Sequence, residues 1–230
     1  MLPVELKGSS VVVIGHFNPA MFHPYWFEKN NVITKDEAEL AVGRKDSFQM
    51  ILTGPLTLFR TEEIFVRVEE NKMQIEAVNN VLTLLKDFVC KTFQALFSYE
   101  IKAFGYNFMA HYRVESKELY QTIGDKLAPK KYWSKLLGDD VEGVDRKGGL
   151  RQMRMTEQKS DDSGQIIINF EPSIRVKPLG VYIACNDHYN LKENMQDGQS
   201  LAQIVSETFD ERMSYLEELQ QDLLKKLINE

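Results

Sequence analysis

The feature that most constrains the fold of this chain is that its period-two segments come in runs rather than singly. Apolar and polar residues alternate through 47–77, and three further segments of this kind cover 150–158, 165–176 and 181–191. Such alternation is typical of strands that turn one face to solvent, which pair in antiparallel sheets. Strands that alternate one by one with helices would instead indicate a parallel sheet. The sequence therefore predicts an α+β fold with an antiparallel sheet of several strands.

Two long apolar helices are expected to pack against this sheet. Residues 78–97 and 201–228 carry apolar side chains at steps of three and four residues, which is the spacing of one helix face. Strands are also expected over 10–15 and 102–114, before the first and the second of these helices, respectively. At 1.5 Å per residue the second helix is about 42 Å long, whereas four or five strands cover only about 20–25 Å. The end of this helix is therefore expected to overhang the sheet.

Length and composition fit one domain. The chain has 230 residues, of which 43% are hydrophobic and 27% are charged, so it can bury a core and is not disordered. We expect a single α+β domain over 1–230, with candidate sub-halves 1–115 and 116–230 that each contain a group of strands closed by an apolar helix.

The charge balance and the cysteines limit the partners and the compartment. A net charge of -6 disfavours broad nucleic-acid binding, which needs a basic footprint, but it leaves room for a local basic groove. Cys90 and Cys185 lie in apolar runs, which predicts buried thiols. No apolar run approaches the eighteen residues of a membrane span, and the first residues lack the pattern of a signal peptide. A cytoplasmic protein without a membrane partner is expected.

No pattern in the sequence assembles catalytic groups. There is no phosphate-binding glycine loop and no G-x-S-x-G around a nucleophilic serine. The four histidines lack the i, i+4 spacing of a helical zinc site, and no two cysteines are close enough in sequence to bind one zinc ion together. Neither a metal site nor a cofactor is expected, which favours a protein that works by binding.

The first hypothesis is a non-enzymatic interaction or adaptor protein. The end of the terminal helix carries Leu216, Leu219, Leu223 and Leu227 at helical steps, beyond the part that a small sheet would cover. We expect these side chains to pack on a second copy of the chain or on another protein. Packing on the chain's own sheet is the alternative.

The second hypothesis is a metal-dependent nuclease or phosphodiesterase. Glu100-Ile101-Lys102 resembles the E-x-K end of a restriction-type nuclease core, in which two acids hold Mg²⁺ and the lysine orients water. The site needs a second carboxylate, which Glu171 on another strand would supply. A surface ion pair at the start of a strand is the alternative.

The third hypothesis is a sensor of a nucleotide or another small ligand. His16, His23 and Trp26 lie in an aromatic, proline-containing corner directly after a core strand. A second group of candidate ligand-binding residues combines cations with an aromatic ring, and its members are Lys130, Lys131, Trp133 and Arg151. Such a group suits an anionic ligand or single-stranded nucleic acid. The alternatives are an aromatic cover over the end of the sheet and a solvated basic face.

The C-terminal half of the chain resembles an uncharacterised family of prokaryotic proteins of similar size. The resemblance lies in a run of late strands that ends in Asn186-Asp187-His188 and is followed by a closing helix. It covers less than half of the chain and implies no activity, but it favours a prokaryotic origin.

Overall fold

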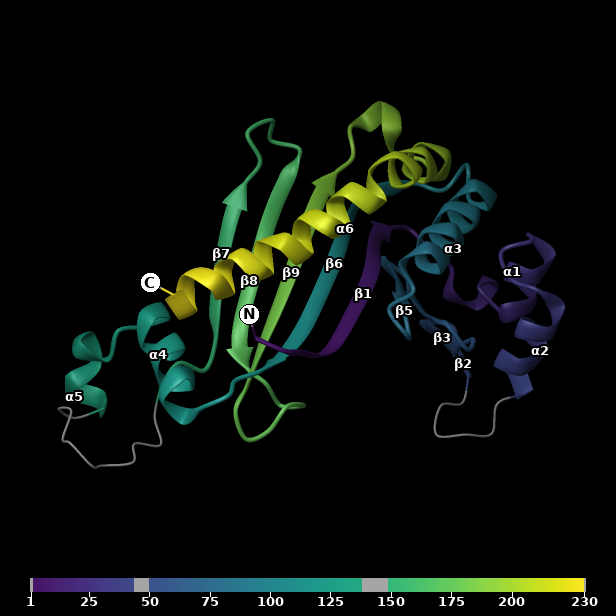
Figure 1. Ribbon diagram of the computed structural model, residues 1–230. Coiled ribbons are helices and arrows are strands. Elements are labelled where there is room, and N and C mark those ends of the chain that lie inside the picture. The colour runs from purple at the N-terminus through teal and green to yellow at the C-terminus, as the bar shows by residue number, and fades with distance from the viewer. Residues whose placement is uncertain (1, 44–49, 138–148, 230) are drawn as a thin grey trace.

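A nine-stranded antiparallel sheet forms the body of the protein (Figure 1). The computed structural model describes residues 2–43, 50–137 and 149–229, and all nine strands lie within them. Their order is β2-β3-β4-β5-β1-β6-β9-β8-β7. The strands are β1 (Val4–Gly15), β2 (Ile51–Leu52), β3 (Leu56–Arg60), β4 (Ile64–Glu69), β5 (Lys72–Ala77), β6 (Ile101–Arg113), β7 (Met153–Gln158), β8 (Gly164–Pro172) and β9 (Gly180–Asn190). The predicted α+β class with an antiparallel sheet is therefore confirmed.

The two longest strands, β1 and β6, pair at the centre of the sheet. Their register aligns Val11 with Tyr106 and Val13 with Phe104, and all four side chains are buried. Val12, between the two valines, points to the opposite face and is partly exposed. One face of the sheet is therefore apolar and covered, as the alternating sequence predicts.

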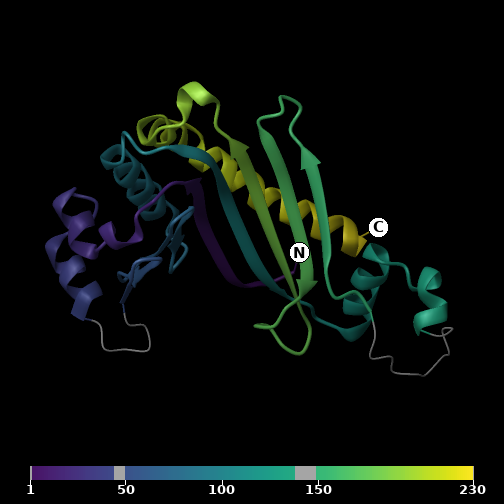
Figure 2. The ribbon, with the colours of Figure 1, turned by 180° about the vertical axis from the view of Figure 1, so that it is seen from behind.

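Helices cover that apolar face. Helices α3 (Leu82–Ala95) and α6 (Gly198–Asn229) pack against each other, and α6 also lies on β6 and β9. Figure 2 shows the opposite face, where no described helix lies in front of the central strands. The other helical segments are η1 (Pro19–Met21), α1 (Pro24–Lys29), α2 (Lys35–Gly43), α4 (Lys117–Leu127), η2 (Lys130–Trp133), α5 (Ser134–Leu137) and η3 (Glu193–Met195).

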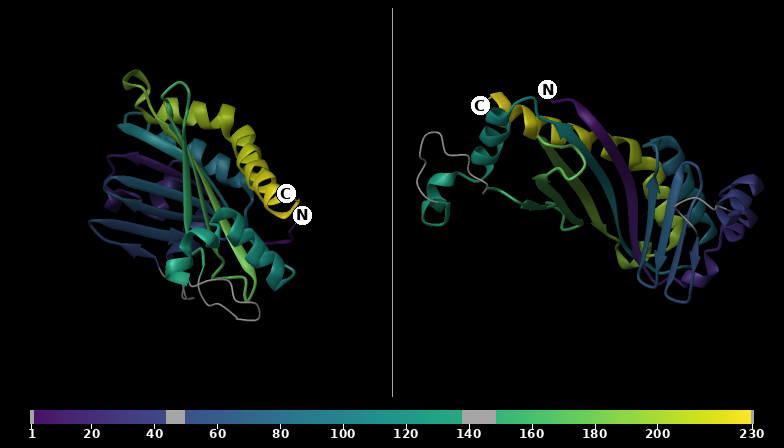
Figure 3. Two further views of the ribbon diagram at one scale, coloured as in Figure 1. Left: turned by 90° about the vertical axis from the view of Figure 1, so that its left-hand side faces the viewer. Right: turned by 90° about the horizontal axis from the view of Figure 1, so that it is seen from below.

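The long helix α6 stays on its own sheet to its last turns. It contains 32 residues and crosses the strands diagonally from α3 to α4 (Figures 1 and 3). Leu216 and Leu224 are fully buried, and Leu227 is only 7% exposed. The expected overhang is wrong, because nine strands at about 4.8 Å each make a sheet about 43 Å wide instead of 20–25 Å, and because α4 packs against the end of α6.

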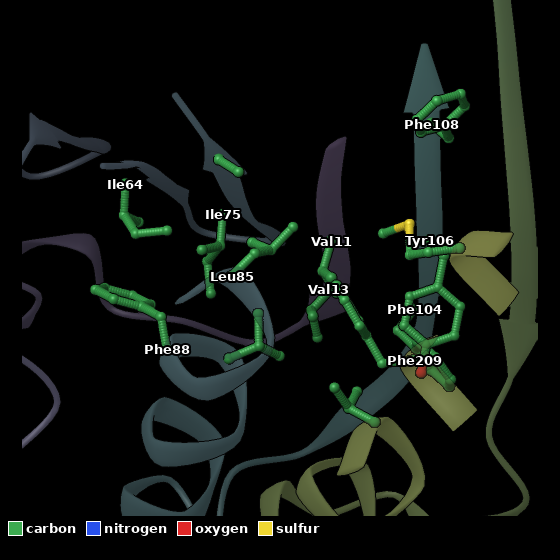
Figure 4. Packing of buried hydrophobic residues seen from close by; sticks show 14 of the residues in the cluster. Val11, Val13, Ile64, Ile75, Leu85, Phe88, Phe104, Tyr106, Phe108 and Phe209 are labelled. Carbon is green, nitrogen blue, oxygen red and sulfur yellow. The ribbon is translucent and has the colours of Figure 1, made fainter. Parts of the chain in front are cut away.

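The core forms where the central strands meet α3 and α6. Figure 4 shows Val11 and Val13 of β1 next to Leu85 of α3. The rings of Tyr106 and Phe209 meet edge to face with their centroids 5.7 Å apart, which joins β6 to α6. One buried cluster thus connects both parts of the chain.

Short-range sequence signals mark the ends of two helices. Thr34 and Glu37 form a capping box at the start of α2: the Glu37 amide donates to Thr34 Oγ1 at 3.3 Å, and the Thr34 amide donates to Glu37 Oε2 at 2.7 Å. Helix α4 ends before Pro129, which cannot continue a helix. The predicted meander over 47–77 appears as β2 to β5, although residues 47–49 lie outside the described part.

Within the described part of the chain, no helix combines the length and the hydropathy that crossing a bilayer requires.

Candidate functional site

A cavity of about 790 Å³ lies beneath α4, η2 and α5, beside one end of the sheet. Its size falls within the range of about 300–1,000 Å³ that is typical of small-molecule sites. The apolar part of its lining includes Ile123, Trp133, Leu136, Phe170, Leu179 and Val181. It is the clearest candidate for a binding site among the described residues.

The roof of the cavity is α4, which is fixed at both ends. At its start the Ser116 hydroxyl caps the helix by accepting from the Leu119 amide at 3.1 Å. At its end Lys126 Nζ donates to the Leu227 carbonyl in the last turn of α6, at 2.9 Å. Ile123 is buried between these contacts. Helix α4 is therefore anchored to α6 and not only to its neighbours in sequence.

The floor is formed by the end of β8, the start of β9 and the 173–179 loop between them. Main-chain hydrogen bonds close this loop: Ser173 N donates to Gly180 O at 2.8 Å, and Val114 N donates to Leu179 O at 2.9 Å. The Ser173 hydroxyl lies 2.8 Å from His111 Nδ1. Burial lowers the pKa of His111, which favours a neutral ring at neutral pH. The floor is thus held in one conformation by contacts of its own.

The described lining carries more positive than negative charge. It contains Lys117, Lys130 and Arg151, but only one acid, Asp125. Lys130 Nζ lies 3.1 Å from Asp125 Oδ1, so these two charges neutralise each other. Arg151 lies near Tyr120, where burial raises the pKa of the phenol and the guanidinium opposes that rise.

The structure brings three of the predicted ligand-binding residues together. Lys130, Trp133 and Arg151 all line the cavity. Lys131 is a neighbour outside the lining, with its Nζ 5.0 Å from the centroid of the Tyr132 ring. The other three candidates, His16, His23 and Trp26, belong to the first half of the chain and do not reach this site.

The aromatic corner after β1 has a structural role. Trp26 packs against the core and meets Phe22 with ring centroids 5.2 Å apart. His23 is the N-cap of α1, where its Nδ1 accepts from the Tyr25 amide at 3.3 Å. Burial lowers the pKa of His23, which suits this acceptor role. These contacts account for two of the three residues as parts of a packed corner.

The predicted nuclease residues are only partly assembled. Lys102 Nζ lies 3.5 Å from Glu100 Oε1, and His16 Nε2 lies 3.7 Å from Glu100 Oε2, so these three exposed side chains form one cluster. Glu171 pairs with Tyr182, which in turn pairs with His111 near the other end of β6. At about 3.3 Å per residue along β6, His111 is about 30 Å from Lys102, so Glu171 lies far from the cluster around Glu100. No group of three His, Cys, Asp or Glu side chains suited to a metal occurs among the described residues.

Residues at the end of α6 contribute to the chain's own core. Leu216 and Leu227 are buried, whereas Leu219 and Leu223 are partly buried and pack against the same cluster. The apolar surface left for a partner on this face is therefore smaller than the sequence suggests. Association through these four leucines stays a prediction.

An ionic cluster under α6 was missed from the sequence. Asp187 on β9 is fully buried and accepts from Arg212 Nε of α6 at 2.6 Å and from the Tyr189 hydroxyl at 3.0 Å. Lys159 Nζ lies 2.7 Å from the other carboxylate oxygen. The alternation of the sequence does indicate its burial, because Asp187 is two residues from the buried Cys185 and therefore points to the same face of β9. A charge at an apolar position of a strand indicates a buried partner.

Comparison with family models and with curated proteins finds no match to this chain. The resemblance of its C-terminal half to a prokaryotic family therefore stays a prediction.

Proposed function

We propose that this protein binds a small molecule in the cavity beneath α4. The observation that carries this proposal is the cavity itself, about 790 Å³ in volume and lined mainly by aromatic and aliphatic side chains with a few polar groups. This combination is typical of sites that bury most of a small ligand. The proposal develops the sensor hypothesis, since Lys130, Trp133 and Arg151 are lining residues.

The way the walls are anchored supports the proposal. Lys126 fixes the roof to the last turn of α6, and main-chain hydrogen bonds at Ser173 and Val114 close the floor. Walls that are already ordered lose little conformational freedom when a ligand arrives, so more of the contact energy appears as affinity.

The order of elements offers a second support. We infer that the chain consists of two parts, residues 4–95 and 101–229, that follow one plan: a long strand, a helical insertion, a meander whose last strand pairs with the first strand, and a closing helix. The division lies before β6 and not at the expected boundary between 1–115 and 116–230, because β6 is the opening strand of the second part. In the first half, the insertion fills the space against β3 and α3 with Phe22 and Phe27, which are fully buried. In the second half, the insertion α4–η2–α5 stands over a cavity instead. This difference between the two halves favours a binding function for the cavity.

Gly124 provides a sharp test. It lies on α4 and lines the cavity, and a Cβ added there would meet nothing within 4 Å. Gly124→Leu therefore fills the cavity without a steric clash at Cβ, and it should not weaken the helix because glycine is the poorer helix former by about 1 kcal/mol. Thr122→Leu is the matched control, since Thr122 is exposed on the same helix and is absent from the lining.

The probe is N-phenyl-1-naphthylamine, a neutral apolar fluorophore whose emission rises in a dry site. We expect saturable binding at one probe per chain, a loss of at least tenfold in affinity in Gly124→Leu, and an affinity within twofold of the wild type in Thr122→Leu. Absence of saturable binding to the wild type, or equal binding to the wild type and Gly124→Leu, would overturn the proposal.

A further inference from the structure

We propose that the ligand of this cavity is an organic anion, with an apolar body and one carboxylate, phosphate or sulfonate group, and that Arg151 binds the anionic group. This inference rests on the proposed function and adds the chemical class of the ligand to it.

The charges of the lining carry the first step. Among the described lining residues, Lys130 and Asp125 form an ion pair at 3.1 Å, so their charges neutralise each other. The described lining also contains Arg151, whose guanidinium forms no ion pair with a described residue. A cation without a counter-charge beside apolar walls raises the local concentration of anions, because the walls exclude the water that would screen it. The cavity therefore favours a negative over a neutral or positive ligand of the same shape.

Arg151 is the lining cation best placed to bind the anionic group of the ligand. No carboxylate within the described ranges forms an ion pair with it, and its side chain is exposed rather than packed. The nearest acid in the strand pairing, Glu171, is engaged by Gln152, whose Nε2 donates to Glu171 Oε1 at 2.9 Å. The guanidinium thus keeps its donors for another acceptor.

The position of Arg151 also fits the role. Its main chain follows Leu150, which packs against the core and lines the cavity, so the base of the side chain is held at the rim. Tyr120, close to Arg151, lines the same cavity and can donate its hydroxyl hydrogen. A planar guanidinium that donates two parallel hydrogen bonds suits a carboxylate, phosphate or sulfonate better than a lysine does.

The experiment compares two probes of one skeleton. 1-Anilinonaphthalene-8-sulfonate carries a sulfonate that N-phenyl-1-naphthylamine lacks, and the rest of the two molecules is the same. We expect the wild type to bind the sulfonate probe at least tenfold more tightly than the neutral probe. We expect Arg151→Gln to remove at least tenfold of the affinity for the sulfonate probe and to leave the affinity for the neutral probe within twofold.

Arg154→Gln is the control, because Arg154 is an exposed cation three residues away that does not line the cavity. It should leave both affinities within twofold of the wild type. Equal affinity of the wild type for both probes, an equal loss of both probes in Arg151→Gln, or the same loss in Arg154→Gln would overturn the anion inference. These results differ from failure of the proposed function, in which the neutral probe does not bind the cavity at all.

Discussion

Removal of the Asp187 charge should destabilise the protein more than any surface substitution. The carboxylate is fully buried and accepts from Arg212 at 2.6 Å and from Tyr189 at 3.0 Å, with Lys159 at 2.7 Å. Asp187→Asn keeps the shape but leaves two cations that are only 14% and 21% exposed without their counter-charge. Breaking a buried ion pair from one side costs about 3–5 kcal/mol, a large part of the roughly 5–15 kcal/mol that stabilises a domain.

The stability lost in Asp187→Asn should also depend on pH. Burial already lowers the pKa of Lys159, and Asp187 opposes that effect. Without Asp187 the folded-state pKa of Lys159 falls further, so the unfolded chain binds more protons than the folded one up to the ordinary value of 10.5. The folded variant therefore regains stability as pH rises, and its deficit relative to the wild type should narrow between pH 7 and about 10.

Urea denaturation followed by circular dichroism measures both effects. Asp210→Asn is the control, because Asp210 pairs with Lys86 but is 70% exposed, and it should cost less than about 1 kcal/mol. A free energy of unfolding for Asp187→Asn within about 1 kcal/mol of the wild type at pH 7 would refute the reasoning. Two largely buried cations without a counter-charge should destabilise the fold by more than that.

Two further predictions concern buried polar groups. Burial raises the pKa of Cys185 from 9.0 to about 11, so stability is full below pH 9 and is lost toward pH 11. Between pH 9 and 10 the wild type should lose up to about 1.4 kcal/mol more than Cys185→Ala in urea unfolding, and parallel curves would contradict this. Gln220 is buried, donates to the Phe108 and Ile183 carbonyls at 3.0 and 3.2 Å and accepts from the Tyr112 hydroxyl at 2.9 Å. Gln220→Leu should therefore cost about 2–3 kcal/mol in the same assay, and a neutral result would show that water or other groups replace the amide.

Local signals in the sequence predict much of the fold. The alternation through 102–114 gives both faces of β6, because a strand turns successive side chains to opposite sides. The Thr34 and Glu37 pair marks the start of α2, and Pro129 marks the end of α4, because each acts within one turn of helix. These features depend only on residues close together in the chain.

Features that depend on long-range pairing could not be predicted. The nine strands come together in one sheet only through the pairing of β1 with β6, and this width keeps the end of α6 covered. The same pairing places His16 beside Glu100, although the sequence assigned them to different hypotheses. Asp187 is neutralised by a hairpin residue and a helix residue, Lys159 and Arg212, and neither is a neighbour in sequence.

The cavity could be predicted from the sequence only in part. Lys130 and Trp133 are one helical turn apart, so the sequence could group them. Their meeting with Phe170 and Val181 depends on how α4 packs over the end of the sheet, which no local pattern encodes. Local sequence patterns therefore identify part of the lining but not the cavity that it encloses.

A crystal structure of the protein grown with 1-anilinonaphthalene-8-sulfonate tests the central claim most directly. We expect the naphthalene ring to lie between α4 and the end of β8, against Phe170 and Val181, with the sulfonate within hydrogen-bond distance of Arg151. A probe bound only elsewhere on the surface, or a space beneath α4 filled by the chain's own side chains, would contradict it.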